Sequence, residues 1–234
     1  MNVQLLIPAA GAGRRMGAET PKALLALGGV PMLIRTLECF QTIGLLEEAV
    51  ITAPHDRLDL FNDVLQQFFT HSAFRIVEGG AERQDSVSNG LSALEPATEI
   101  VIIHDAARPF VSADSIQASI DAARDCGAAT VAIPVVDTIL QGDENAYLVS
   151  TPDRRQLWAC QTPQTFRVDV IRRAHTLAQK EGYTGTDDAS LVRRMGEPVK
   201  LVMGTPLNFK VTTPSDYALA EMILEKGGPE CVSA

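Results

Sequence analysis

Short apolar, β-branched runs alternate along the chain with longer amphipathic segments. Runs of this kind predict buried strands. They occupy Val3–Ile7, Glu48–Ala53, Arg75–Glu78, Ile100–His104 and Thr130–Ile133. Between them, apolar residues recur at three- and four-residue spacing, which predicts helices. The predicted helices occupy Pro31–Ile43, Asp56–Phe69, Gln84–Leu94, Ala113–Cys126 and Val168–Glu181. This alternation favours an α/β fold with a mostly parallel sheet covered by helices.

A final helix is predicted near the end of the chain. Thr213 suits the N-cap and Pro214 suits the first helical position. We expect this helix to run to about Glu225, before the stop at Gly227-Gly228-Pro229.

One region, residues 135–160, breaks the alternation. It contains the runs Asp137–Gln141 and Ala146–Thr151, separated by the polar Gly142-Asp143-Glu144-Asn145. This pattern predicts a two-stranded β-arm that projects from a single domain spanning residues 1–234. Because an isolated two-stranded ribbon is marginally stable, we expect the arm to pack on another surface. A second copy of the chain is the simplest candidate, which predicts a homodimer.

Composition agrees with one folded domain and narrows its partners. The chain has 234 residues, of which 46% are hydrophobic and 21% charged, so a core of its own is expected. The formal net charge of −9 opposes binding to a nucleic acid polymer, which requires a broad basic surface. A small anion remains possible, since it needs only a few well-placed cations.

The cysteines and the N-terminal run indicate a cytoplasmic protein with no membrane association. Cys39, Cys126, Cys160 and Cys231 form no C-x-x-C pair, so reduced thiols are expected. The apolar run Val3–Ala10 is too short for a membrane span and lacks the basic segment of a signal peptide.

A glycine-rich turn follows the first predicted strand. Its glycines allow backbone N–H groups to approach phosphate oxygens, and three cations accompany them. The backbone candidates are Ala9, Ala10, Gly11, Ala12 and Gly13, and the cations are Arg14, Arg15 and Lys22. The turn lacks the G-K-[ST] ending of a Walker A loop, and it has Met16 where the dinucleotide fingerprint requires glycine. We therefore expect a triphosphate site; a plain tight turn with solvated charges is the alternative.

A second motif follows the predicted strand Ile100–His104. Ligands gather at the carboxyl ends of strands in such sheets. Asp105 can face a metal-bound nucleotide and Arg108 can bind a phosphate. Alternatively, the two residues form a structural pair that closes a loop.

The glycine-rich turn with Pro21-Lys22 resembles the signature of the sugar-nucleotide pyrophosphorylase superfamily. The run His104–Pro109 narrows the resemblance to the 2-C-methyl-D-erythritol 4-phosphate cytidylyltransferase family and its relative, the ribitol-5-phosphate cytidylyltransferases. The likeness continues through Gly79–Val87, Pro134–Thr138, Asp153-Arg154, Trp158–Pro163 and Lys210–Thr212.

The resemblance implies a fold and a reaction. The fold is a Rossmann-like, mostly parallel twisted sheet flanked by helices, with the arm serving dimerisation. The reaction transfers CMP from CTP to 2-C-methyl-D-erythritol 4-phosphate, a sugar-alcohol phosphate, and releases pyrophosphate, with Mg²⁺ as cofactor. It belongs to the non-mevalonate route to isoprenoids.

The resemblance also implies a role for each candidate residue. Arg15 and Lys22 stabilise the transition state. Arg154 and Lys210 hold the sugar phosphate, together with Thr138, Arg108 and Thr162. The nucleotide site comprises Ala9, Ala10, Gly11, Ala12, Gly13, Arg14, Gly80, Arg83, Ser86, Asp105 and Ala106, and Asp105 is also the candidate metal ligand. In the family the arm exchanges between subunits, which implies a sugar-phosphate pocket shared across the dimer.

Three alternatives stay open at this stage. Ribitol 5-phosphate is the alternative acceptor, although the sequence Arg14-Arg15-Met16 is closer to that of the methylerythritol family. A non-catalytic nucleotide-sensing module could lose Arg15, Lys22 or Lys210, and all three are present. An NAD(P)-dependent reductase is opposed by the broken fingerprint.

Overall fold

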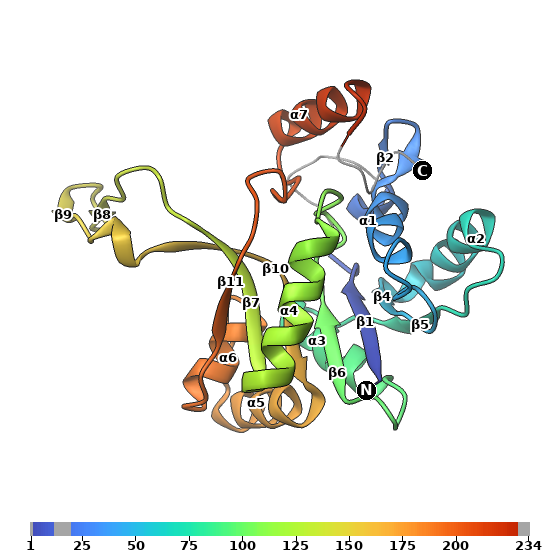
Figure 1. Ribbon diagram of the computed structural model, residues 1–234, viewed down its shortest axis with the longest axis horizontal. Helices are drawn as coiled ribbons and strands as arrows, with labels where there is room; N and C mark the ends of the chain where they lie inside the picture. Colours follow the sequence, from blue (N-terminus) through green and yellow to red (C-terminus); the bar gives the residue numbers. More distant parts are fainter. Residues whose placement is uncertain (1, 12–19, 229–234) are drawn as a thin grey trace.

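The computed structural model describes residues 2–11 and 20–228. Ala12, Gly13, Arg14 and Arg15 therefore lie outside the described residues. At the centre is a seven-stranded sheet with the order β11-β7-β10-β6-β1-β4-β5 (Figure 1). Its strands are β1 (Val3–Pro8), β4 (Val50–Ala53), β5 (Arg75–Glu78), β6 (Ile100–Ile103), β7 (Ala128–Pro134), β10 (Trp158–Arg167) and β11 (Lys200–Met203). β10 is antiparallel to both neighbours, and the other pairs in this sheet are parallel.

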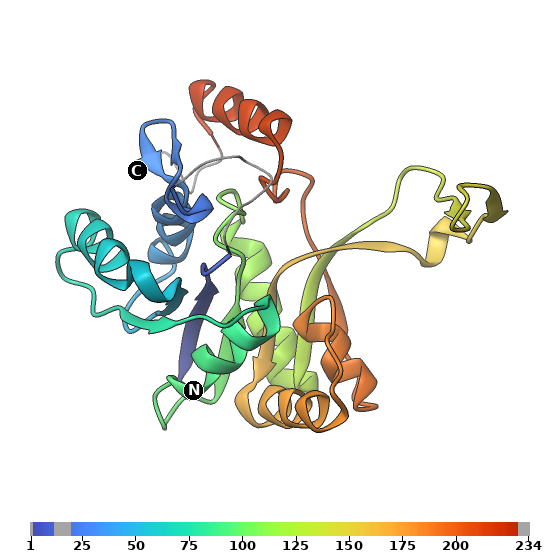
Figure 2. The ribbon, with the colours of Figure 1, turned by 180° about the vertical axis from the view of Figure 1, so that it is seen from behind.

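Helices cover both faces of the sheet (Figures 1 and 2). On one face lie α1 (Met32–Gln41), α2 (Leu58–Phe68) and α4 (Ala113–Cys126). On the other face lie α3 (Arg83–Ser92), α5 (Val168–Glu181) and α6 (Asp188–Arg194). Successive side chains of a strand point to opposite faces, so Leu5 and Ile7 of β1 join the first layer and Leu6 joins the second. The mostly parallel, helix-flanked fold predicted from the sequence is confirmed.

The middle of the sheet is apolar on both faces. All four residues of β6, Ile100–Ile103, are fully buried. Each such side chain contributes about 1.5–3 kcal/mol relative to an exposed one. This burial explains why the strand reads as a continuous apolar run and not as an alternating pattern. It also fixes the position of the segment that follows, which carries Asp105.

A third, smaller cluster packs α7 (Pro214–Glu225) above the sheet's carboxyl edge. It joins the hairpin β2 (Ala26–Leu27) and β3 (Val30–Pro31) to the loop after β6, through Phe110, Val211 and Ala220. Polar contacts reinforce the packing, because the Tyr217 hydroxyl donates to the Ala26 carbonyl and the Gly28 amide donates to Glu221 Oε1 at 2.7 Å. The predicted N-cap of α7 is confirmed, since Thr213 Oγ1 accepts from the Asp216 amide. α7 thereby holds the segment that carries Lys22.

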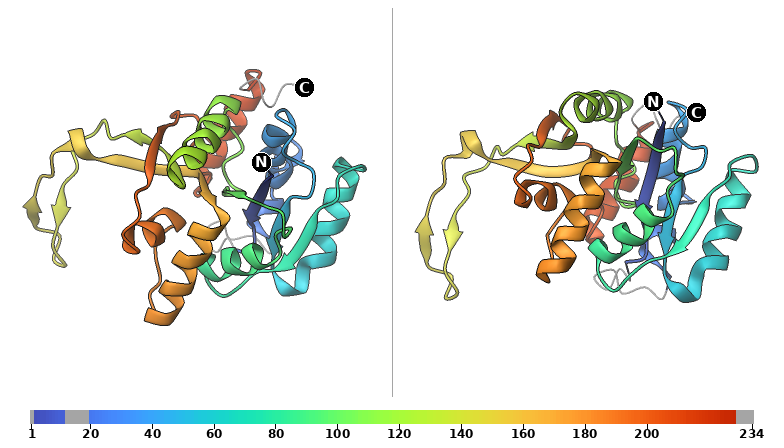
Figure 3. Two further views of the ribbon diagram at one scale, coloured as in Figure 1. Left: turned by 60° about the horizontal axis from the view of Figure 1, so that its bottom comes forward. Right: turned by 90° about the horizontal axis from the view of Figure 1, so that it is seen from below.

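The β-arm leaves the sheet after Pro134 and returns at Trp158, as Figure 3 shows. Its paired strands are β8 (Gln141–Gly142) and β9 (Leu148–Ser150), and η4, the 3-10 helix Arg154–Gln156, follows. The arm was predicted, but the strand expected over 137–141 is wrong. Asp143 closes a tight turn by accepting the amides of Asn145 and Tyr147 through its Oδ1. Pairing is therefore confined to the residues beside that turn.

The arm presents apolar side chains to solvent. Val136 is 80% exposed, and Leu140, Tyr147, Leu148 and Val149 are also exposed. An apolar surface of this kind is typical of an interaction site.

Several elements of the domain, including the β2–β3 hairpin, were not anticipated from the sequence. β10 contains Pro163 and polar side chains, and a register shift between Cys160 and Gln164 accommodates them. β10 also takes Trp158–Cys160 out of the predicted arm and into the sheet. α6 is too short for a clear helical period, and the edge strand β11 pairs on one side only.

Among residues 2–11 and 20–228, no helix combines the length and apolar character needed to cross a membrane.

Gly90 should be intolerant of any side chain, because α3 crosses β1 closely there. A Cβ at this position would lie 2.2 Å from Leu6 Cδ1, and Leu6 is fully buried. We expect Gly90→Ala to lower the free energy of unfolding by about 1–3 kcal/mol, the usual cost of overpacking. Urea denaturation measures this change.

Ser88→Ala, on the exposed side of α3, is the matched control and should change stability by less than about 0.5 kcal/mol. Alanine is a better helix former than glycine by about 1 kcal/mol. If Gly90→Ala stabilised the protein, the gain in helix propensity would outweigh the cost of the contact with Leu6. The close approach of α3 to β1 would then not constrain the fold.

Candidate active site

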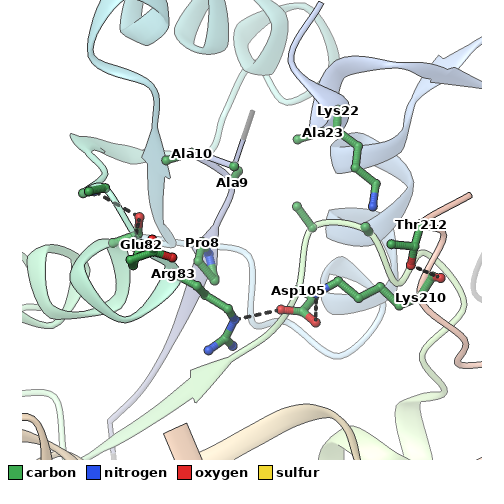
Figure 4. A pocket seen from close by; sticks show the side chains of 16 residues that line it. Pro8, Ala9, Ala10, Lys22, Ala23, Glu82, Arg83, Asp105, Lys210 and Thr212 are labelled. Carbon is green, nitrogen blue, oxygen red and sulfur yellow. Dashed lines mark hydrogen bonds and ion pairs between the residues drawn. The ribbon is translucent and has the colours of Figure 1, made fainter. Parts of the chain in front are cut away.

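A cavity of about 600 Å³ opens at the carboxyl edge of the sheet. The strand order reverses there, since β4 lies on one side of β1 and β6 on the other, and such points are where ligands bind in open α/β sheets. Figure 4 shows the lining side chains, several of which point into the cavity. The lining residues are Pro8, Ala9, Ala10, Gly11, Lys22, Ala23, Gly80, Ala81, Glu82, Arg83, Ser86, Asp105, Ala106, Ala107, Lys210 and Thr212.

One wall of the cavity is backbone from the ends of β1 and β5. The Ala9 amide donates to the Thr52 carbonyl at 2.8 Å, which continues the sheet beyond β1. Gly79 lies so close that a Cβ there would be 2.2 Å from the Cβ of Ala10. The Gly80 amide donates to Ser86 Oγ at 3.0 Å. This wall consists of backbone and short side chains, which leaves room for a planar base.

The N-terminus of α3 faces the cavity and is fixed by a capping box. Glu82 accepts from the Asp85 backbone, and Asp85 Oδ2 accepts from the Glu82 amide at 3.1 Å. Arg83, the first residue of the helix, projects from this turn. A helix N-terminus favours negative charge, so it adds to the attraction of an anion.

Three cations converge on the carboxylate of Asp105. Arg83 Nε donates to its Oδ1 at 3.2 Å, and Lys210 Nζ lies 3.0 Å from its Oδ2. Arg108 Nε lies 3.5 Å from the same Oδ2. Figure 4 shows the contacts of Arg83 and Lys210 across the floor of the cavity. The cluster brings together residues from α3, the loop after β6 and the segment before α7.

Asp105 stays ionised throughout the working pH range. Burial alone would raise its pKa, but the charges of Arg83, Lys210 and Arg108 outweigh burial and hold that pKa far below its usual range. Burial would likewise lower the pKa of Arg83, whereas the charges of Asp188 and Asp105 raise it. The site therefore contains fixed charges at neutral pH.

A buried brace of hydrogen bonds supports Asp105 from behind. Thr162 Oγ1 accepts from the Asp105 amide at 3.1 Å and contacts His104 Nδ1 at 3.0 Å. The other ring nitrogen of His104 lies 3.1 Å from the Arg108 carbonyl. Burial lowers the pKa of His104 to about 4, so the ring is neutral at pH 7. His104 orients its neighbours, and it does not line the cavity.

Arg108 points away from the open part of the cavity. Its Nη1 donates to the Asn208 carbonyl at 2.7 Å and its Nη2 to the Cys160 carbonyl at 3.3 Å. These contacts tie the loop after β6 to β10 and to the segment that carries Lys210.

Lys22 approaches the cavity from the opposite side. It begins η2, the 3-10 helix Lys22–Leu24, which is backed by the buried Ala23 and Leu24. In Figure 4 its side chain extends into the cavity toward Thr212. Lys22, Arg83 and Lys210 thus place positive charge on different sides of one space.

The structure does not bring Thr138 and Arg154 to this cavity. Both lie exposed on the arm, and Arg154 Nη1 donates to the Val136 carbonyl at 2.8 Å. The other described candidates, Ala9, Ala10, Gly11, Gly80, Ser86, Ala106 and Thr162, line the cavity or its buried brace. The candidates Ala12, Gly13, Arg14 and Arg15 fall outside residues 2–11 and 20–228.

Sequence reasoning missed two features of the site. Thr212 lines the cavity, and only its place beside Lys210 could have indicated this. Asp188 contacts Arg83 from α6, and the paired acids Asp187-Asp188 before a short helix were the available signal. Within the described part of the chain, no three His, Cys, Asp or Glu side chains gather as a metal site.

Comparison with known proteins identifies the family. A model of the family described as 2-C-methyl-D-erythritol 4-phosphate cytidylyltransferase matches residues 3–226. A protein of that name from Symbiobacterium thermophilum is 47% identical over 231 residues, which cover 98% of this chain and 95% of the relative. Another, from Caldanaerobacter subterraneus, is 45% identical over 97% of this chain and 100% of its own length.

Solved structures agree with this assignment. The crystal structure of 4-diphosphocytidyl-2C-methyl-D-erythritol synthase from Anaerococcus prevotii has a TM-score of 0.84 at 30% identity, covering 96% of this chain and 98% of that one. The 2-C-methyl-D-erythritol 4-phosphate cytidylyltransferase of Thermus thermophilus has a TM-score of 0.79 at 36% identity, covering 96% and 100%. The resemblance inferred from the sequence motifs is confirmed. The chain belongs to the 2-C-methyl-D-erythritol 4-phosphate cytidylyltransferase family.

Proposed function

We propose that this enzyme transfers CMP from CTP to 2-C-methyl-D-erythritol 4-phosphate, releasing pyrophosphate. Family membership supports the reaction. The observation that carries it in this chain is the convergence of Lys22, Arg83 and Lys210 on one cavity beside a wall of backbone and short side chains. That cavity suits a pyrimidine nucleotide with a charged phosphate chain.

The reaction needs positioning and charge neutralisation more than proton transfer. A phosphate oxygen of the acceptor attacks the α-phosphorus of CTP, and the new P–O bond forms as the bond to the β-phosphate oxygen breaks. The second pKa of a phosphate monoester is about 6, so the nucleophile is already largely dianionic at pH 7. This agrees with a cavity whose described lining contains Lys and Arg but no His or Cys.

Lys22 and Lys210 have different parts in this scheme. Lys22 lines the cavity together with Gly11, beside which the triphosphate is expected, and neutralises charge that develops as pyrophosphate leaves. Lys210 lies beside Asp105 and is placed to hold the acceptor phosphate.

Mg²⁺ is the proposed cofactor, with Asp105 as its protein ligand. Mg²⁺ commonly uses one or two carboxylates together with phosphates and water, so the ion would be held mainly by nucleotide phosphates. Asp105 would bind it by exchanging part of its contact with Arg83 or Lys210 for the ion. Asp105 is ionised and lines the cavity. The ion would neutralise phosphate charge and orient the triphosphate.

We also propose that the working form is a homodimer. Thr138 and Arg154 lie on the arm, away from their own cavity, and the arm presents an apolar surface. An arm that packs on a second copy would cover this surface and could carry both residues to the partner's cavity. The acceptor pocket would then be shared between subunits.

A cytoplasmic location is proposed on the basis of the chemistry. Cys126 and Cys160 are free thiols, as expected in a reducing compartment.

The function is tested by pyrophosphate release from CTP and Mg²⁺, with methylerythritol 4-phosphate or ribitol 5-phosphate as acceptor. We expect turnover with the first acceptor, loss of turnover with a chelator and recovery when Mg²⁺ is restored. Turnover with ribitol 5-phosphate alone would assign the other acceptor. Absence of turnover with both would reject the transferase function.

Lys22→Ala should lower kcat much more than it weakens CTP binding. Its charge is worth most where negative charge concentrates in the transition state, so we expect kcat to fall about 10²-fold or more. Steady-state kinetics gives kcat, and calorimetry gives the Kd for CTP. Lys180→Ala, an exposed lysine on α5, is the control. If CTP binding were lost in proportion and turnover preserved, Lys22 would be a binding residue only.

Arg154→Ala should raise KM for the sugar phosphate about tenfold or more while leaving CTP affinity nearly intact, since the arm would contact only the acceptor. Arg155→Ala is a matched control on the same turn, because the Arg155 guanidinium is paired with Asp153 at 2.7 Å. A selective loss of CTP affinity would contradict this assignment, because it would show that Arg154 serves the CTP subsite.

Mixed dimers test whether the acceptor pocket is shared. A dimer of one Lys22→Ala subunit and one Arg154→Ala subunit would contain one intact site if the two residues meet across the interface. Random mixing should then restore about a quarter of the wild-type activity at limiting acceptor. Mixing without any recovery would show that both residues act within one chain.

A further inference from the structure

Arg83 is the cavity cation with the most closely defined surroundings. Its guanidinium bridges two carboxylates through different nitrogens, Nε to Asp105 at 3.2 Å and Nη1 to Asp188 at 2.6 Å. Asp105 lies in the cavity, whereas Asp188 comes from α6, on the helix layer behind it. Asp188 therefore contacts Arg83, a residue of the nucleotide site, but does not itself line the cavity.

Asp188 is buried and held on several sides. It is 1% exposed, and its Oδ1 lies 3.3 Å from His175 Nε2. Its backbone amide donates to Gln164 Oε1 at 3.0 Å, as does the amide of Ala189 at 3.1 Å. Gln164 is fully buried in β10 and so fixes the first turn of α6 against the sheet. The carboxylate that meets Arg83 consequently has little freedom to move.

The division of Arg83 between two carboxylates has a consequence for the cavity. Asp105 Oδ2 already faces Lys210 at 3.0 Å. Without Asp188, both Nε and Nη1 of Arg83 could turn toward Asp105. Arg83 would then compete with Lys210 for the Asp105 carboxylate. With Asp188 in place, Nη1 is drawn toward α6, and Arg83 remains at the wall between α3 and Asp105.

We propose that Asp188 is a positioning residue for the nucleotide phosphates, which acts by holding Arg83 at the cavity wall. The inference rests on the proposed function, because it assumes that Arg83 meets CTP. His175 and Gln164 complete the support: they hold Asp188, Asp188 holds Arg83, and Arg83 binds the ligand. Such preorganisation matters most for a long side chain that would otherwise sample many rotamers.

A double-mutant cycle on CTP affinity tests this role. The Kd for CTP with Mg²⁺ is measured by calorimetry for the wild type, Asp188→Asn, Arg83→Ala and the double variant. We expect Asp188→Asn to weaken CTP binding about tenfold, as for loss of a charged hydrogen bond. In the Arg83→Ala background the same change should have less than about a twofold effect, because coupled residues are not additive. Equal effects in both backgrounds would overturn the proposal.

Two further variants separate positioning from folding. Asp169→Asn, at the exposed start of α5, alters a carboxylate that pairs with Arg167 at 3.4 Å and, within the described residues, makes no ion pair or hydrogen bond with Arg83, Asp188 or the residues that support Asp188. It should leave the Kd for CTP within about twofold even if Tm falls. His175→Gln disturbs Asp188 on the side away from Arg83. It replaces Asp188→Asn as the test variant if Asp188→Asn does not fold. It should weaken CTP binding in the wild-type background and not in the Arg83→Ala background.

The outcomes distinguish this role from the function on which it rests. If the wild type binds CTP but Asp188→Asn and His175→Gln bind it equally well, the positioning role is wrong and the transferase function stands. If the wild type does not bind CTP, both are overturned.

Discussion

The carboxylate of Asp105 is buried at the end of a buried strand, and a charge in that position has to be paired. The pairing brings Arg83, Arg108 and Lys210 to one point from segments far apart in the chain. Once these cations are gathered, their three positive charges exceed the two negative charges of Asp105 and Asp188 with which they pair. The excess is available to a polyanion entering the cavity. The arrangement of α3, the loop after β6 and the segment before α7 can thus be understood as the framework for this cluster.

Much of the central fold could be predicted from the sequence. The strands β1, β4 and β6 are largely apolar runs, because they are buried between two layers, and the helices α1 and α2 have a clear helical period of apolar residues. β10 could not be predicted, since its polar residues and Pro163 do not resemble an interior strand. Its position depends on pairing with β6 and β7, which no local pattern records. The short strands of the arm depend similarly on the turn made by Asp143.

The candidate site shows the same division. Each of the motifs around Lys22, Gly80, Asp105 and Lys210 is a short continuous stretch of sequence that can be recognised locally. The fold brings the four motifs to one cavity. Asp188 escaped notice because it lies 105 residues from Arg83 in the chain, and two adjacent acids at the start of a short helix do not by themselves indicate which residue they contact. Arg154 is the opposite case. Its motif was recognised, but its own chain keeps it on the arm, so sequence alone does not say which cavity it serves.

The arm's connection to the sheet has a consequence for how the fold tolerates change. It leaves from β7 and returns through β10, where Pro134 pairs with Trp158 and the Val135 amide donates to the Leu157 carbonyl at 3.0 Å. The two ends of the excursion are therefore already joined by the sheet. The entropy of closing such a loop grows only slowly with its length, so residues can be added to or removed from the tip with little cost to the domain. The tip of the arm can consequently change in length while the sheet and the cavity at its carboxyl edge stay the same.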